Sequence, residues 1–161
     1  MILNFEKIDD DSRLWIYQSN RTLSNHEKIL ISDKIEGFLK SWTSHGNHLF
    51  CSFKIKYDLF IFIVLDEQKS AATGCSIDKL TAFIRSIEND LSISLLDRLY
   101  ISYRQNEVIS VEKLNDFKDK ILKEKITNNT IVFNNLITHK KDLLENWEVP
   151  VSKSWHVKLL G

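Results

Sequence analysis

Alternation between apolar and polar positions divides the first 104 residues into strands and helices. Residues 13–18, RLWIYQ, are rich in aromatic and β-branched side chains and predict a strand. Residues 48–56 alternate between apolar and polar positions, which predicts a strand with one solvated face. Residues 59–65, LFIFIVL, are apolar throughout and predict a strand buried on both faces. A fourth strand is predicted over residues 98–104.

Two amphipathic helices separate these strands. Ser24 and Glu27 have the spacing of a capping box, in which each side chain binds a free amide at the start of a helix. Apolar residues then recur every three or four positions, and His45–Gly46 is expected to end this helix in a left-handed conformation. The second helix is expected to have Ser76 as its N-cap and to continue to Leu91.

The order strand, helix, strand, strand, helix, strand is typical of ferredoxin-like folds. We therefore predict an α+β protein with a split βαβ (βαββαβ) core over residues 1–104, built on an antiparallel sheet in the order fourth, first, third, second strand. The two helices would cover one face of that sheet. We expect an α/β extension, residues 105–161, to cover the second face with its Trp15 and Tyr17, because a large exposed apolar face promotes association. The chain, 1–161, would then be a single compact domain; a dimer partner is the alternative cover.

The C-terminal extension has a pattern of its own. It predicts a hairpin strand at 108–111, a helix with Leu114, Phe117, Ile121 and Leu122 on its apolar stripe, a strand at 130–133 and a last helix around 140–147. This succession resembles the small GYF-like adaptor modules that bind proline-rich peptides, although the glycine-tyrosine-phenylalanine signature is missing. The resemblance implies a peptide or partner chain held by Trp147, Trp155 and their neighbours.

Composition excludes several classes of protein. Twenty-two Lys and Arg residues balance 22 Asp and Glu residues, so no net charge attracts nucleic acid or an anionic membrane. The longest apolar run, residues 59–65, is far shorter than the roughly 20 residues that cross a bilayer, and no signal-peptide pattern is present. A cytoplasmic location is expected, with Cys51 and Cys75 as free thiols.

Six segments together indicate a relationship that spans nearly the whole chain: RLWIYQSNR, FLKSWTSHG, GCSID, LLDR, TIVFNNL and the final SW. Their combination resembles a family of small bacterial proteins of unknown function that is often labelled "ABC transporter ATPase". An ABC ATPase requires the phosphate-binding motif G-x-x-x-x-G-K-[ST], and this chain, with four glycines, does not contain it. We therefore expect neither ATPase activity nor a cofactor.

The small residues around Cys75 are the strongest candidate for chemistry. Cys75 could simply fill space beneath the helix start, or its thiolate could be stabilised there as a nucleophile. In the split βαβ arrangement the end of the first helix and the start of the second helix lie at the same edge of the sheet. This would place His45 and Asp78 near Cys75 as catalytic partners. Ligand-binding residues along the same edge would be Arg13, Ser76 and Arg104. His48 and Cys51 would point to opposite faces of a strand, so no metal site is predicted.

Two functions from different classes follow. The favoured one is a non-catalytic cytoplasmic binding or adaptor protein, monomeric or homodimeric, with a protein or peptide partner. The alternative is a small-molecule enzyme that uses Cys75 as nucleophile, together with His45 and Asp78.

Overall fold

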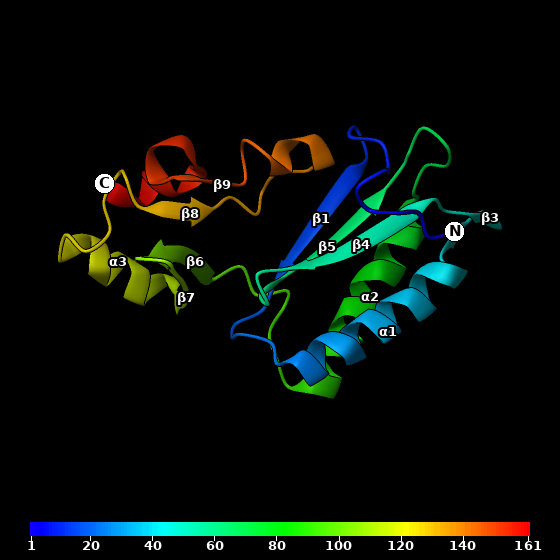
Figure 1. The fold of residues 1–161 in the computed structure, drawn as a ribbon, viewed down its shortest axis with the longest axis horizontal. Coiled ribbons are helices and arrows are strands. Elements are labelled where there is room, and N and C mark those ends of the chain that lie inside the picture. The colour runs from blue at the N-terminus through cyan, green and yellow to red at the C-terminus, as the bar shows by residue number, and fades with distance from the viewer. The chain divides into compact units, whose positions relative to one another are not determined.

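The computed structural model describes residues 1–161, which form two compact units (Figure 1). The first unit comprises residues Met1–Leu96 and Thr138–Lys141, and the second comprises Asp97–Ile137 and Asp142–Gly161. All strand pairs in the named sheets are antiparallel, and helices and strands are both present in each unit. The α+β class is therefore confirmed, whereas the expectation of one domain across 1–161 stays a prediction.

The first unit is a three-stranded sheet with two helices side by side on one face (Figure 1). Its strand order is β1-β5-β4, which agrees with the predicted order of the first, third and second strands. The fully buried β5 lies in the centre, as its continuous apolar sequence indicates. The elements are β1 (Arg13–Gln18), α1 (Asn25–Ser41), β4 (Cys51–Lys56), β5 (Phe60–Leu65) and α2 (Gly74–Leu91), with a short hairpin of β2 (Thr43–Ser44) and β3 (Asn47–His48).

Trp15 and Tyr17 face the helices, not the second face of the sheet as the sequence led us to expect. Both belong to the apolar core between the sheet and the two helices, and the Trp15 ring meets the edge of Trp42 at a centroid distance of 6.0 Å. Leu14 and Ile16 are also large and apolar, so β1 carries no polar alternation that distinguishes its two faces.

Part of the second face is covered by the N-terminal segment. The Phe5 ring stacks on Phe62 at a centroid distance of 6.2 Å. Beside this pair, Lys54 Nζ lies 2.7 Å from a carboxylate oxygen of Glu6. The chain before β1 thus contributes to a cover that was expected from residues 105–161 or from a dimer partner.

The ferredoxin-like sheet of four strands is not formed. The fourth strand, β6 (Tyr100–Gln105), pairs with β7 (Val108–Lys113) and β8 (Ile131–Phe133) in a separate sheet. The edge of β1 where it was expected is instead occupied by residues 138–140. There Leu14 N donates to Thr138 O at 2.8 Å, and Lys140 N donates to Ser12 O at 2.9 Å.

The second unit is a four-stranded sheet in the order β7-β6-β8-β9, with β9 at Glu148–Pro150. Helix α3 (Leu114–Leu122) contributes Phe117 to a core shared with Tyr103 and Val132. Leu122, which was predicted on the apolar stripe of this helix, is 82% exposed. The helix predicted around residues 140–147 is replaced by a short 3-10 turn, η1 (Lys140–Leu143), and two further 3-10 turns, η2 (Val151–Lys153) and η3 (Trp155–Leu160), follow β9. None of the helices is both long enough and apolar enough to cross a lipid bilayer.

Candidate functional site

The end of α1 and the start of α2 meet, as the topology predicted. Trp42 follows the last residue of α1, and its Nε1 donates a buried hydrogen bond of 2.9 Å to Ser76 O. The N-cap of α2 is Thr73, however, and Ser76 is the buried third residue of the helix. Thr73 N donates to Ser76 Oγ at 2.7 Å, and Ser76 N donates to Thr73 Oγ1 at 3.3 Å. Ser76 therefore caps the helix with Thr73 and does not face a ligand.

The predicted catalytic residues lie at this edge but are not joined to one another. Cys75 is exposed in the first turn of α2, so it does not fill space beneath the helix start. His45 does not terminate α1; with Gly46 it forms the turn of the β2–β3 hairpin, where their φ angles are 50° and 79°. His45, Cys75 and Asp78 are all exposed, and no hydrogen bond or ion pair links their side chains. A nucleophile and its base need hydrogen-bond reach, so their catalytic role stays a prediction.

The two predicted ligand-binding arginines belong to different units. Arg13 on β1 lies 3.6 Å from Glu67 and packs over the Trp15 ring at 4.7 Å. Arg104 is on β6 in the second sheet and binds both carboxylate oxygens of Glu148, at 3.0 and 3.2 Å. The argument that placed both guanidiniums along one sheet edge required β6 to pair with β1, and that pairing is absent.

The tryptophan proposed to hold a peptide is largely buried. Trp147 is 4% exposed, its ring lies 5.0 Å from that of Phe133, and its Nε1 donates to Asn135 Oδ1 at 3.0 Å. Trp155 is partly exposed and stacks on His156 at 4.0 Å. Trp147 thus stabilises the second unit itself.

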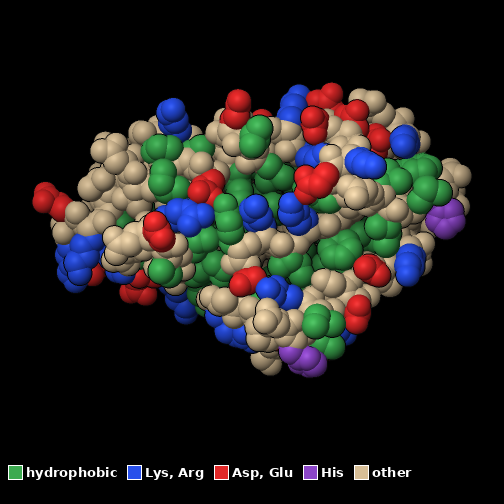
Figure 2. All heavy atoms as spheres, viewed as in Figure 1, with side chains coloured by type: hydrophobic (Ala, Val, Ile, Leu, Met, Phe, Trp, Pro, Cys, Tyr) green, Lys and Arg blue, Asp and Glu red, His purple; other side chains and the backbone are tan.

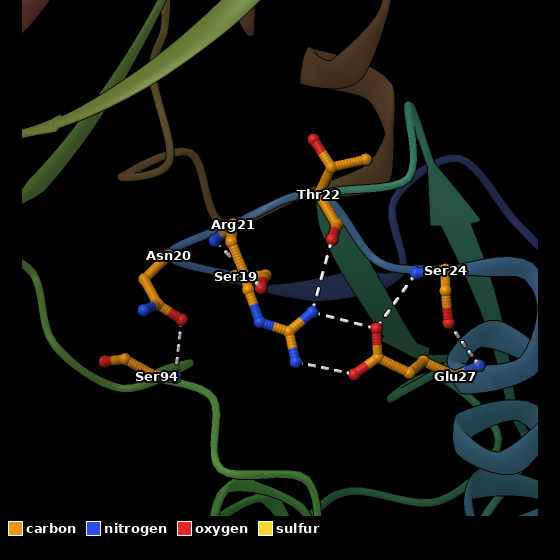
Figure 3. A network of polar contacts seen from close by, with 7 residues as sticks. All are labelled: Ser19, Asn20, Arg21, Thr22, Ser24, Glu27 and Ser94. Atoms are coloured by element: carbon orange, nitrogen blue, oxygen red, sulfur yellow. Dashed lines mark hydrogen bonds and ion pairs between the residues drawn. The ribbon is translucent and has the colours of Figure 1, made fainter.

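A polar network fixes the start of α1 (Figure 3). The Arg21 guanidinium donates to both carboxylate oxygens of Glu27, at 2.8 and 2.7 Å. Glu27 also accepts from Ser24 N at 3.0 Å, while Glu27 N donates to Ser24 Oγ at 3.1 Å, which completes the predicted capping box. The bonds from Arg21 and then from Ser24 lower the pKa of Glu27 to about 2. The first turn of α1 is therefore held by a charged hydrogen-bond network.

An open groove of about 610 Å³ lies between this part of α1 and strand β4. Ile29 is 60% exposed on its helical wall, which makes the groove partly apolar. Next to it, Lys28 Nζ forms an ion pair of 2.6 Å with Asp58 in the β4–β5 turn, and this contact ties the helix to the end of the strand. The lining residues are Asn25, Lys28, Ile29, Ser32, Asp33 and Ile55.

The outer edge of β4 is only partly paired. At its start, Cys51 N donates to Met1 O at 3.0 Å and Leu3 N donates to Cys51 O at 2.7 Å. Backbone groups of alternate residues point to the same side of a strand, so Phe53 and Ile55 also direct their N–H and C=O groups outward. No hydrogen bond is made on this side by either residue. An unpaired backbone edge therefore runs beside the groove.

The unpaired edge and its groove were not predicted from the sequence, although two features of the sequence indicate them. The alternation in residues 48–56 predicts an edge strand with one solvated face. The exposed Ile29 departs from the apolar periodicity of α1, whose buried positions are Ile31, Ile35 and Leu39. An apolar residue outside the buried stripe, opposite an edge strand, is the feature that marks the groove.

Charged residues of both signs are interspersed over the face seen in Figure 2, with apolar atoms between them. No group of three or more His, Cys, Asp or Glu side chains is placed to hold a metal ion. Comparison with protein-family models, curated proteins and solved structures finds no match to this chain.

Proposed function

We propose that the chain is a non-catalytic cytoplasmic adaptor that binds an extended peptide segment of a partner protein by adding it as a strand to β4. The observation that carries this proposal is the unpaired backbone of Phe53 and Ile55 beside the groove. The proposed ligand is the peptide, and the phosphate-binding motif of an ABC ATPase is missing from the sequence.

Strand addition suits both parts of the site. The backbone edge gives affinity without regard to sequence, and a neighbouring groove selects every second side chain of the added strand. Phe53 and Ile55 offer two N–H and two C=O groups, and a net gain of about 1 kcal/mol for each hydrogen bond gives a few kcal/mol in all. Side-chain burial in the groove has to add to this, so we expect a Kd in roughly the micromolar range.

The N-terminal segment already pairs with the start of this edge. Ile2 forms a single parallel bridge with Cys51, which supports the proposal that a segment can be added further along β4. The segment then leaves the edge, because Phe5 stacks on Phe62 and Glu6 binds Lys54 on the second face of the sheet. The rest of β4 is left for a partner.

Hydrogen exchange of individual amides tests the proposal. Binding peptides are selected from a random dodecapeptide library, and amide exchange of the intact protein is followed by NMR. The Phe53 and Ile55 amides should exchange rapidly in the unbound protein and become protected in the complex. Ser52 and Lys54 direct their amides toward β5, so they should be protected in both states.

A pair of matched variants locates the groove. Ile29→Glu places a charge on the groove wall and should weaken the binding of the selected peptides by about tenfold or more. The matched control is Leu122→Glu, which introduces the same charge at an exposed aliphatic residue of α3. Leu122 lies outside the groove, so this variant should leave binding unchanged. Selected peptides that bind without protecting Phe53 and Ile55, or that respond equally to both variants, would contradict strand addition at β4.

A further inference from the structure

The charges around β4 define the chemistry of its partner. We propose, resting on the function above, that the added segment has an aliphatic side chain opposite Ile55 and an acidic side chain next to it, opposite Lys56. Adjacent residues of an extended segment point to opposite faces of the sheet. One side chain of the pair therefore enters the groove, and the other lies over the second face.

The groove side favours an aliphatic residue. Ile55 faces the core under the helices, and a residue paired with it points the same way, toward Ile29. Lys28 is already paired with Asp58, so it offers no unpaired cation in the groove. Asp33 lies on the helical wall and would repel an acidic side chain that entered from this face.

The second face offers an unpaired ammonium group. Lys54 and Lys56 both project from this face of β4, but Lys54 Nζ is held at 2.7 Å by Glu6. Lys56 Nζ lies over the Tyr57 ring at 4.8 Å and forms no ion pair. A carboxylate on the neighbouring strand would meet Lys56 directly across the pair, where opposite charges stabilise strand association.

The same lysines disfavour a second copy of this chain as the occupant. Antiparallel pairing of two β4 edges through Phe53 and Ile55 places Lys54 opposite either Lys54 or Lys56 of the other copy. Like charges directly opposite one another destabilise strand pairs. A register shifted toward Cys51 avoids this repulsion but collides with the segment that Met1 to Leu3 already places there. Charge complementarity therefore favours an acidic partner segment.

Defined peptides and a charge reversal test the pattern. The probes are two blocked nonapeptides, one alternating valine with glutamate and one alternating valine with lysine, titrated into the full-length protein and followed at the Phe53 and Ile55 amides. The glutamate peptide should bind about twofold to fivefold more tightly, which is within the range expected of one partly exposed charge pair. Lys56→Glu should reverse this preference. The control is Lys79→Glu, at an exposed residue of α2. It changes the net charge of the protein by the same amount as Lys56→Glu but should not reverse the preference for the glutamate peptide.

The outcomes separate the two proposals. Equal affinity of the two peptides, weak binding of both, or a preference that Lys56→Glu leaves in place would overturn the acidic pattern. If library-selected peptides still protect Phe53 and Ile55 in that case, strand addition at β4 stands with a different partner chemistry. If no selected peptide protects these amides, strand addition itself is wrong.

Discussion

At the scale of single residues, the two cysteines have opposite environments. Cys51 is fully buried on β4, with its Sγ 3.7 Å from the carbonyl oxygens of Met1 and Leu49. Burial raises the pKa of its thiol to about 11, so almost none of it is thiolate near neutral pH. Cys75 is exposed. We expect Ellman's reagent to modify one thiol of the folded protein, Cys75, and the second only on unfolding. Loss of the fast reaction in Cys75→Ser is the control, and rapid modification of Cys51 in the folded state would contradict the expectation.

The same reaction distinguishes the adaptor from the thiol enzyme. No hydrogen bond links His45 to Cys75, so replacing the imidazole should leave the rate of Cys75 modification unchanged. His45→Asn is the suitable change because asparagine tolerates the left-handed φ of 50° at this position. A selective decrease in the rate would favour the enzyme with Cys75 as nucleophile.

At the scale of elements, the start of α1 depends on a charge pair as well as on its cap. The pKa of Glu27 is lowered from 4.5 to about 2, so this carboxylate contributes stability above pH 4.5, and the contribution is lost as the pH falls toward 2. Arg21→Ala should raise the pKa of Glu27, as measured by NMR of its carboxyl carbon. The loss of stability should stay below about 1 kcal/mol, since the Arg21 side chain is 46% exposed. Lys34→Ala, which breaks a separate surface pair with Asp90, should leave the Glu27 titration unchanged.

Local patterns predicted the elements better than their partners. The Ser24–Glu27 capping box and the buried β5 are each specified by neighbouring residues, and both are confirmed. The strand predicted over residues 48–56 is confirmed only from Cys51, and its expected solvated face is at most partly exposed, because Ser52 is buried. Whether β6 pairs with β1 depends on residues far away in sequence, so residues 98–104 alone do not specify it. In the structure, β6 forms a hairpin with β7 through the turn at Asn106–Glu107. The groove also depends on tertiary structure, because it requires one face of α1 to lie opposite the edge strand β4. The apolar periodicity of a helix does not specify which strand lies opposite it.

At the scale of the whole molecule, the two compact units are not continuous in sequence. The predicted core ended at residue 104, whereas the first compact unit ends at Leu96 and recruits Thr138–Lys141. Lys140 anchors this distant segment, because its buried Nζ donates to Ile8 O at 2.7 Å. Such a return of the chain has no local signature, since each of its contacts joins residues far apart in sequence.

The pH dependence of folding provides a last prediction, which centres on His156. This imidazole is 1% exposed, stacks on Trp155 and lies 2.7 Å, through Nδ1, from Ser154 Oγ. Burial lowers the pKa of His156 from 6.5 to about 4, so the folded protein keeps it neutral where the unfolded chain takes up a proton. The free energy of unfolding should therefore fall between pH 6.5 and pH 4, by at most about 3 kcal/mol from this group.

Urea unfolding of the full chain across that pH range measures the effect. His156→Gln removes the titrating group and should flatten this part of the curve, even if the lost packing lowers stability at every pH. The control is His45→Asn, which replaces an exposed imidazole and tolerates the left-handed φ of this position; it should leave the slope as it is in the unmodified protein. An equal slope in the protein with and without His156 would show that the imidazole is protonated in the folded state, and that burial in the core with Phe117 does not exclude its charge.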